Sequence, residues 1–194
     1  MLVWADQVLC ATNQVRTQMN QEIRTLLGFS SEEPQPGDRI ISLRNHWDLV
    51  SYTNPELPLT NGTLLTIDDY RKQTIQVPKY IYADRIIPIM ITAATSDDFS
   101  EKFNNLVIDY NSIVKGTKTL DNRQEYMMAK ARNLMDPPLE FAYGYALTCH
   151  KAQGSQWNKI LVIEESFPFD YDMHRRWLYT AITRAVDKLV LIKK

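Results

Sequence analysis

Strand and helix patterns alternate at both ends of the chain, whereas short strand patterns dominate its middle, and this contrast constrains the fold most. Near the start, the apolar run at residues 7–11 precedes apolar side chains at helical steps of four and three, namely Val15, Met19, Ile23, Leu26 and Leu27. Near the end, strand patterns at residues 141–148, 159–164 and 187–192 accompany a helical pattern at residues 171–185. Alternating strands and helices predict an α/β domain.

The middle of the chain follows a linker-like stretch at residues 30–37, which contains two prolines and a glycine. Short strand patterns then occur at residues 38–43, 63–67, 74–77 and 85–92. Pro88, within the last of these, predicts an edge strand or a bulge. Two helices are expected at residues 97–110 and 120–135.

The length of 194 residues is enough for one domain that contains a smaller inserted one. We therefore expect an α/β domain formed by residues 1–36 and 140–194, interrupted by a β-rich insertion with extra helices at residues 37–139. The chain has 22 Lys+Arg against 23 Asp+Glu, so its net charge is −1. This balance excludes a polycationic nucleic-acid binder, and any nucleic-acid contact must come from a few placed residues.

The cysteines and histidines predict no metal site. Cys10 and Cys149 do not form a C-x-x-C motif, and none of the three histidines is paired at ligand spacing. We expect two reduced thiols in a reducing compartment. No apolar stretch approaches the ~20 residues that a membrane span needs, and the first residues lack the pattern of a signal peptide. These observations predict a soluble, cytoplasmic protein with no membrane partner.

Nucleotide-binding loops are absent from the sequence. None of the six glycines begins a G-x-x-x-x-G-K-[ST] loop, and there is no G-x-G-x-x-G motif. The apolar runs at residues 106–109 and 161–165 each end in an acid, as does the strand whose acid holds magnesium in many nucleotide hydrolases. Without a phosphate loop, we interpret both runs as interior segments that end at the edge of a sheet.

Two segments in the last third combine residue types that suit phosphate contacts. Residues 145–157 (YALTCHKAQGSQW) add a hydroxyl, an imidazole, an ammonium, an amide and a glycine to the end of an apolar run. These groups suit the phosphates of a nucleotide or of a nucleic-acid backbone, although a solvated loop with a helix cap fits equally well. Arg184 comes late in a helical pattern, where a guanidinium either offsets the helix dipole or reaches a phosphate on a neighbouring domain.

Together, residues 145–157 and 176–192 (RWLYTAITRAVDKLVLI) resemble motifs V and VI of superfamily 1 helicases, in order, in spacing and in the buried strand between them. The likeness is greatest to the RecD/Dda-like (SF1B) branch, which has 5′→3′ polarity. Residues 8–24 resemble the strand and helix that open the second motor domain, and residues 37–45, followed by Asn61-Gly62, resemble the start of that branch's inserted SH3-like 2B domain. The resemblance implies a RecA-like parallel-sheet domain without its own phosphate loop, interrupted by an SH3-like insertion.

The resemblance also implies residue roles. Thr148, His150 and Lys151 match positions that contact the backbone of single-stranded DNA. The residues that match ATP-binding positions are Gln153, Gly154, Ser155, Gln156, Thr183 and Arg184. Among these, Arg184 matches the catalytic arginine finger that completes the γ-phosphate site, and Gln156 stands where many relatives have a glutamate near the ribose.

By this resemblance the chain is the C-terminal half of an ATP-dependent DNA helicase. Its expected partners are single-stranded DNA, the duplex fork and an N-terminal RecA-like domain of the same parent chain. That domain would hold most of the ATP and Mg²⁺, so the chain alone is expected to be inactive. The alternative is a non-catalytic nucleic-acid or protein-interaction module on a helicase-like scaffold, and a phosphate loop upstream in the parent reading frame would distinguish the two.

Overall fold

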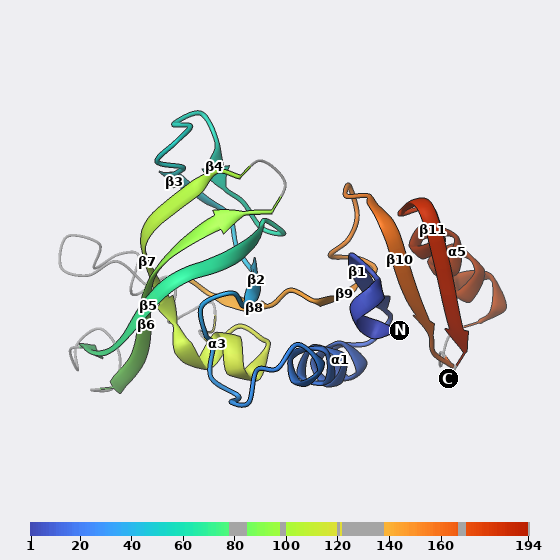
Figure 1. Cartoon of the computed structure of the whole chain (residues 1–194), viewed down its shortest axis with the longest axis horizontal. Helices are drawn as coiled ribbons and strands as arrows, with labels where there is room; N and C mark the ends of the chain where they lie inside the picture. Colours follow the sequence, from blue (N-terminus) through green and yellow to red (C-terminus); the bar gives the residue numbers. More distant parts are fainter. Residues whose placement is uncertain (78–84, 98–99, 120, 122–137, 167–169, 194) are drawn as a thin grey trace. The chain divides into compact units, whose positions relative to one another are not determined.

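The computed structural model describes residues 1–77, 85–97, 100–119, 121, 138–166 and 170–193. The chain divides into two compact units (Figure 1). Unit 1 comprises Met1–Glu32 and Gly144–Lys194, and unit 2 comprises Glu33–Tyr143. The domain boundaries predicted from the sequence, after residue 36 and before residue 140, both lie inside unit 2. In the described part of the chain, no helix combines the length and the apolar character that crossing a membrane requires.

Unit 1 contains a four-stranded sheet with the strand order β11-β10-β1-β9, in which every neighbouring pair is parallel. Its strands are β1 (Gln7–Cys10), β9 (Ala146–Thr148), β10 (Trp157–Glu164) and β11 (Ala185–Lys193). The other elements are the short 3-10 helix η1 (Leu2–Trp4) and the helices α1 (Asn13–Leu26) and α5 (Tyr171–Ile182). All residues of β1 and β9 are buried, as is typical of parallel strands. The predicted α/β fold is confirmed.

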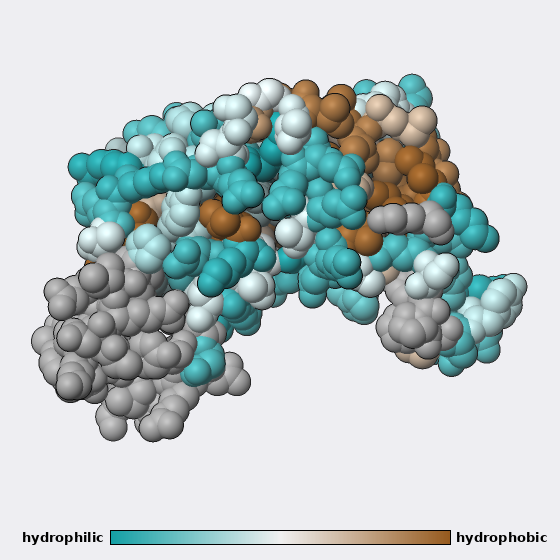
Figure 2. All heavy atoms as spheres, turned by 90° about the horizontal axis from the view of Figure 1, so that it is seen from below, coloured by the Kyte–Doolittle hydropathy of each residue, from teal (hydrophilic) through white to brown (hydrophobic). Residues whose placement is uncertain are grey.

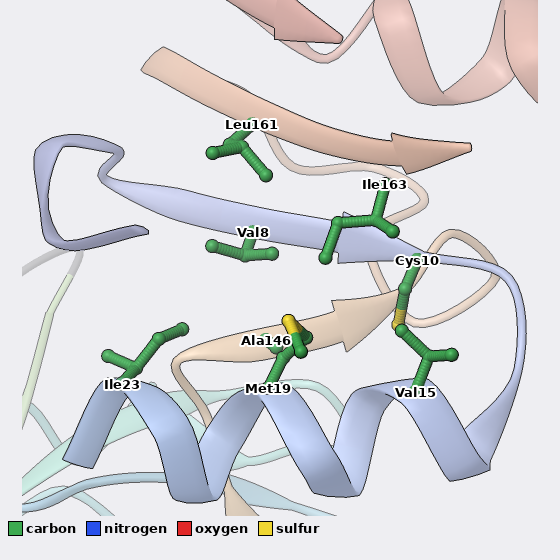
Figure 3. Packing of buried hydrophobic residues seen from close by; sticks show 8 residues of the cluster. All are labelled: Val8, Cys10, Val15, Met19, Ile23, Ala146, Leu161 and Ile163. Atoms are coloured by element: carbon green, nitrogen blue, oxygen red, sulfur yellow. The ribbon is translucent and has the colours of Figure 1, made fainter. Parts of the chain in front are cut away.

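Helix α1 begins and ends as its sequence predicts. The hydroxyl of Thr12 accepts a hydrogen bond from the backbone N–H of Val15 at 3.3 Å, and Gly28 follows the helix with φ +91°, which glycine adopts without steric cost. Figure 3 shows its apolar face against three strands, in a cluster of Val8, Cys10, Val15, Met19, Ile23, Ala146, Leu161 and Ile163. Each large side chain buried here contributes roughly 1.5–3 kcal/mol, so packing dominates the stability of the helix.

Strand β11 closes the sheet of unit 1 as an edge strand, because it pairs only with β10. Several of its apolar side chains are exposed, namely Val186, Leu189, Leu191 and Ile192. In Figure 2, hydrophobic atoms gather over the part of unit 1 that contains β10 and β11. The end of unit 1 formed by these strands therefore presents exposed apolar side chains to solvent.

Unit 2 is antiparallel. Its five-stranded sheet has the order β7-β6-β5-β2-β8, and β3 pairs with β4 separately. The strands are β2 (Arg39–Ser42), β3 (His46–Val50), β4 (Pro58–Leu59), β5 (Leu64–Val77), β6 (Arg85–Ser96), β7 (Lys102–Asp109) and β8 (Phe141–Tyr143), and the helix is α3 (Tyr110–Lys115). The largest fully buried side chains of the unit include Ile40, Leu65, Met90, Phe103 and Phe141. The predicted β-rich character of this region is confirmed.

The prediction of a helix at residues 97–110 is wrong, because most of this segment is strand β7. Thr92 of β6 pairs with Leu106, and Ala94 pairs with Phe103, so two asparagines of β7 face the single residue between them. Asn105, one of the two, has φ +55°. This bulge separates two buried side chains by three residues instead of two, and their spacing therefore imitates a helical face.

The strand expected at residues 141–148 is divided between the two units. Its first part is β8, which pairs antiparallel with β2, and its second part is β9, which pairs parallel with β1. Pro88 lies in an inner strand, but pairing of β6 with β7 begins only at Ile89, so β6 has no β7 partner at the proline. The helix expected at residues 120–135 lies outside the described residues apart from residue 121.

Candidate nucleotide and nucleic-acid site

The first part of the candidate site is the turn that follows β9. The backbone N–H of Lys151 donates to the Thr148 carbonyl at 2.9 Å, and that of Ala152 is shared between the carbonyls of Thr148 and Cys149, at 3.2 Å each. Ala152 is fully buried and anchors the turn. Gly154 has φ +92°, and a Cβ there would meet nothing within 4 Å, so the backbone conformation rather than the available space favours glycine.

The turn presents polar groups of both predicted roles to solvent. Its exposed or half-buried side chains are those of His150, Lys151, Gln153, Ser155 and Gln156, whereas Thr148 is buried at the end of its strand. In parallel α/β sheets, ligands bind at the carboxyl ends of the strands. Thr148, His150 and Lys151 come together at this edge of the sheet, which we call the carboxyl edge.

The second part of the site is Arg184, which follows the last turn of α5 rather than lying inside the helix. Its Nε donates to the Thr180 carbonyl at 3.2 Å, its Nη1 to the Ser155 carbonyl at 3.3 Å, and its Nη2 to Oγ1 of Thr183 at 3.3 Å. The backbone N–H of Trp157 donates to the carbonyl of Arg184 at 3.0 Å. The structure therefore brings Ser155 together with Thr183 and Arg184, although Arg184 lies 29 residues further along the chain.

These contacts orient the guanidinium of Arg184 without using all its donors. A guanidinium has five N–H groups, so two have no hydrogen bond among the described residues. The side chain is half-buried, and its charge acts on the nearby thiol of Cys149. Burial raises the pKa of that thiol, and Arg184 lowers it by a smaller amount. An arginine held in this way is oriented before an anionic ligand binds.

The strand register separates the two parts of the site. Leu9 of β1 pairs with Leu147 in β9 and with Val162 in β10, so these residues lie at one level of the sheet. Thr148 lies just beyond that level. Trp157, beside Arg184, begins β10 at the opposite edge, roughly 20 Å of strand away from the level of Thr148. The turn and the residues after it, 149–156, run from one edge to the other.

Glu165, which directly follows β10, forms contacts that the sequence did not predict. Its Oε2 accepts hydrogen bonds from the backbone N–H groups of Ala11 (2.5 Å) and Thr12 (3.1 Å), and its Oε1 accepts one from the Thr12 hydroxyl at 2.6 Å. The carboxylate therefore holds the connection between β1 and α1. Asp109, the acid of the other run, caps α3 by accepting from the N–H of Asn111 at 2.9 Å. Both runs end at the edge of a sheet, as we interpreted them.

Asn20 is a second residue that the sequence did not single out. Its Oδ1 accepts from the backbone N–H of Ala146 at 2.9 Å, and its Nδ2 donates to the Ala146 carbonyl at 3.0 Å and to the Arg16 carbonyl at 3.0 Å. The amide thus pairs with the outer side of β9, two residues before Thr148. The sequence signal that could have identified Asn20 is its position, because it is a polar residue beside Met19 on the buried face of the predicted helix.

The described residues contain no group of three or more His, Cys, Asp or Glu that could hold a metal ion. Cys10 and Cys149 are free and buried. Burial raises the pKa of Cys10 to about 12, and Glu165 adds to this effect. Because the thiolate is the reactive form, neither cysteine is suited to act as a nucleophile near neutral pH.

Comparison with known proteins gives both a sequence and a structural likeness. Residues 143–192 match the model of the UvrD-like helicase C-terminal domain family. The structure is similar to the Pif1 helicase from Candida albicans, with a TM-score of 0.50 and 16% identity over 96% of this chain and 44% of that chain. It is also similar to Bacteroides Pif1 bound to ssDNA, with a TM-score of 0.50 and 15% identity over 95% of this chain and 40% of that chain. No curated protein matches the sequence.

The chain therefore spans less than half the length of these helicases. The family match covers both parts of the candidate site, from before Thr148 to beyond Arg184. The predicted resemblance to a helicase C-terminal domain is confirmed for residues 143–192, and the parallel-sheet fold predicted for unit 1 is confirmed by its strand order and by the likeness to the two Pif1 structures.

Proposed function

Because residues 143–192 form a UvrD-like helicase C-terminal segment, we propose that the chain is the C-terminal half of an ATP-dependent DNA helicase with 5′→3′ polarity. The observation that supports this proposal most is the geometry of Arg184. Its guanidinium is held by Ser155 and Thr183, and two of its N–H groups have no hydrogen bond among the described residues. An N-terminal motor domain of the same parent chain supplies the phosphate loop and the magnesium acid, which this sequence lacks.

On the nucleotide side, Arg184 acts as the arginine finger. Its remaining N–H groups stabilise the charge that develops on the γ-phosphate of an ATP held by the other motor domain. The exposed or half-buried polar groups of Gln153, Gly154, Ser155, Gln156 and Thr183 line the same cleft. Arginine fingers contribute roughly 10³–10⁵ to the rate of phosphoryl transfer, so the cleft hydrolyses ATP only when this domain closes it.

On the DNA side, the carboxyl edge of the sheet contacts the strand. The hydroxyl of Thr148, the imidazole of His150 and the ammonium of Lys151 suit phosphate oxygens of single-stranded DNA. Contacts of this kind predict binding that weakens with salt and depends little on sequence. Opening and closing of the nucleotide cleft then move this edge along the strand, which converts hydrolysis into translocation.

Unit 2 corresponds to the inserted 2B domain in this proposal, with residues 1–36 and 140–194 forming domain 2A and residues 37–139 the SH3-like insertion. The antiparallel sheet of unit 2 and its separate β3–β4 pair support this assignment. Its place in the chain, between two parts of the motor domain, favours a role at the duplex fork.

The test is DNA-stimulated ATP hydrolysis by the parent polypeptide, with Arg184→Ala compared with wild type. We expect the stimulated rate to fall by two or more orders of magnitude while the affinity for single-stranded DNA is retained. Arg184→Lys keeps the charge but loses the forked geometry, so it should also be strongly impaired. Arg176→Ala, which removes an exposed arginine of the same helix, is the matched control and should stay within twofold of wild type.

An unchanged rate in Arg184→Ala would show that this arginine only offsets the helix dipole at the end of α5. The non-catalytic binding module would then be the better explanation of the fold. Retained single-strand binding, measured by fluorescence anisotropy, shows that the variant is folded.

A further inference from the structure

Two adjacent glutamates at the end of β10 bond to different parts of unit 1. Glu165 is only 8% exposed, and it holds the connection between β1 and α1 through three hydrogen bonds. Oε1 of Glu164 lies 2.8 Å from Nε2 of His174 on α5, and both side chains are half-buried. Glu165 therefore ties the end of β10 to the connection between β1 and α1, and Glu164 ties it to α5.

The residues that Glu165 holds lie beside the proposed DNA contacts. Cys10, which precedes Ala11, pairs with Thr148, and the N–H of Cys149 donates to the carbonyl of Cys10 at 3.0 Å. The Thr12 hydroxyl that bonds to Glu165 also caps α1. A displacement of this edge is therefore passed directly to the end of β10.

Helix α5 extends from the carboxyl edge of the sheet to the opposite edge, where Arg184 lies. His174 lies in its first turns, next to Glu164, and Arg184 follows its last turn. Its 12 residues extend over roughly 18 Å, which is close to the distance that separates Thr148 from the Arg184 end of the sheet. A helix held at its start by Glu164 and at its end by the contacts of Arg184 moves as one body.

We propose that Glu164 and Glu165 link the DNA-contacting edge of the sheet to the helix that ends at Arg184, and so couple DNA binding to ATP hydrolysis. This inference rests on the proposed function. Neither glutamate touches DNA or nucleotide; both are positioning residues. DNA binding at Thr148 stiffens the connection between β1 and α1 that Glu165 holds. The contact between Glu164 and His174 passes this change to α5, and α5 sets the position of the Arg184 guanidinium.

The test uses the parent polypeptide and measures the ratio of its ATPase rate with saturating single-stranded DNA to its rate without DNA. Glu165→Gln removes the charge and one acceptor oxygen, and His174→Phe removes the nitrogen that faces Glu164 while keeping a ring. Each variant should lower the ratio about tenfold, a size typical of coupling between sites. The rate without DNA and the affinity for single-stranded DNA should stay within twofold of wild type.

The double variant provides the sharper result. Because the two contacts act in series, Glu165→Gln with His174→Phe should lose little more of the ratio than either single change. Glu22→Gln is the matched control, since Glu22 is exposed on α1 and bonds only to Gln18 among the contacts described.

An unchanged ratio in both single variants would overturn the link. A ratio that falls only as far as DNA affinity or the thermal midpoint falls would overturn it too, because that is the behaviour of a merely structural contact. If the wild-type parent shows no DNA-stimulated hydrolysis, the proposed function itself is wrong, which separates the two failures. His174→Phe, at a half-buried position, keeps the test valid if Glu165→Gln is unstable.

Discussion

Replacing Asn20 with leucine tests whether one buried amide holds the edge strand β9 in place. Strand β9 pairs with β1 on one side only, and on the other side the N–H and C=O of Ala146 bond to the Asn20 amide at 2.9 and 3.0 Å. Ala146 is fully buried, so water cannot replace these bonds. Each buried backbone group left unpaired costs about 1–3 kcal/mol, so the loss of two should lower the free energy of unfolding of unit 1 by about 2–6 kcal/mol.

Leucine keeps the branching and the four heavy side-chain atoms of asparagine, so the substitution leaves no cavity and removes the hydrogen bonds of the amide. Urea unfolding followed by tryptophan fluorescence reports mainly on unit 1, which contains three of the four tryptophans (Trp4, Trp157 and Trp177), and NMR hydrogen exchange of the Ala146 amide reports on the contact itself. Gln21→Leu, at the next and exposed position of α1, is the control. The reasoning is refuted if Asn20→Leu unfolds at the same urea concentration as wild type and the Ala146 amide stays protected.

Four further outcomes are expected. Gly154→Ala should cost about 1–2 kcal/mol through its positive φ alone, and Gly154→Asn less, as thermal unfolding will show. Asn105→Gly should leave unit 2 as stable as wild type, whereas Asn105→Val should lower its thermal midpoint, because a β-branched residue resists φ +55°. The raised pKa of Cys10, about 12, means that the thiol ionises first in the unfolded chain, so stability should decline from about pH 9 towards pH 12. Cys10→Ala should reduce that decline in denaturation curves recorded across this range. The chain alone should hydrolyse no ATP in a phosphate-release assay, and robust turnover would contradict the proposed function.

Unit 1 could be predicted from the sequence because its signals are local. The cap at Thr12, the glycine at residue 28 and the apolar steps between them specify α1 without knowledge of the rest of the chain. The buried part of β10 is an apolar run flanked by polar residues, which is visible in the sequence. The strand end at Thr148 was visible in the same way, whereas Arg184, expected inside a helix at residues 171–185, follows α5, which ends at Ile182.

The mistakes arose where a distant segment decides the structure. The asparagine bulge in β7 exists because β6 pairs on both sides of it, and the spacing of Phe103 and Leu106 alone cannot reveal that partner. Residues 141–148 form one apolar run, but its halves bond to strands in different units. Asn20 was missed because its structural role depends on hydrogen bonds to Ala146, which lies 126 residues away in sequence.

The separation of the candidate site into two edges also depends on register, and it limits how the two parts can communicate. A change at Thr148 cannot reach Arg184 by contact, because roughly 20 Å of sheet lies between them. Among the described residues of unit 1, the connection at residues 149–156, strand β10 and helix α5 extend between the two edges. The first connects both parts directly, so changes there should alter DNA binding and nucleotide turnover together. The contacts of Glu164 and Glu165 lie outside both parts, and for that reason a change in coupling without a change in either binding step distinguishes the α5 route from the connection.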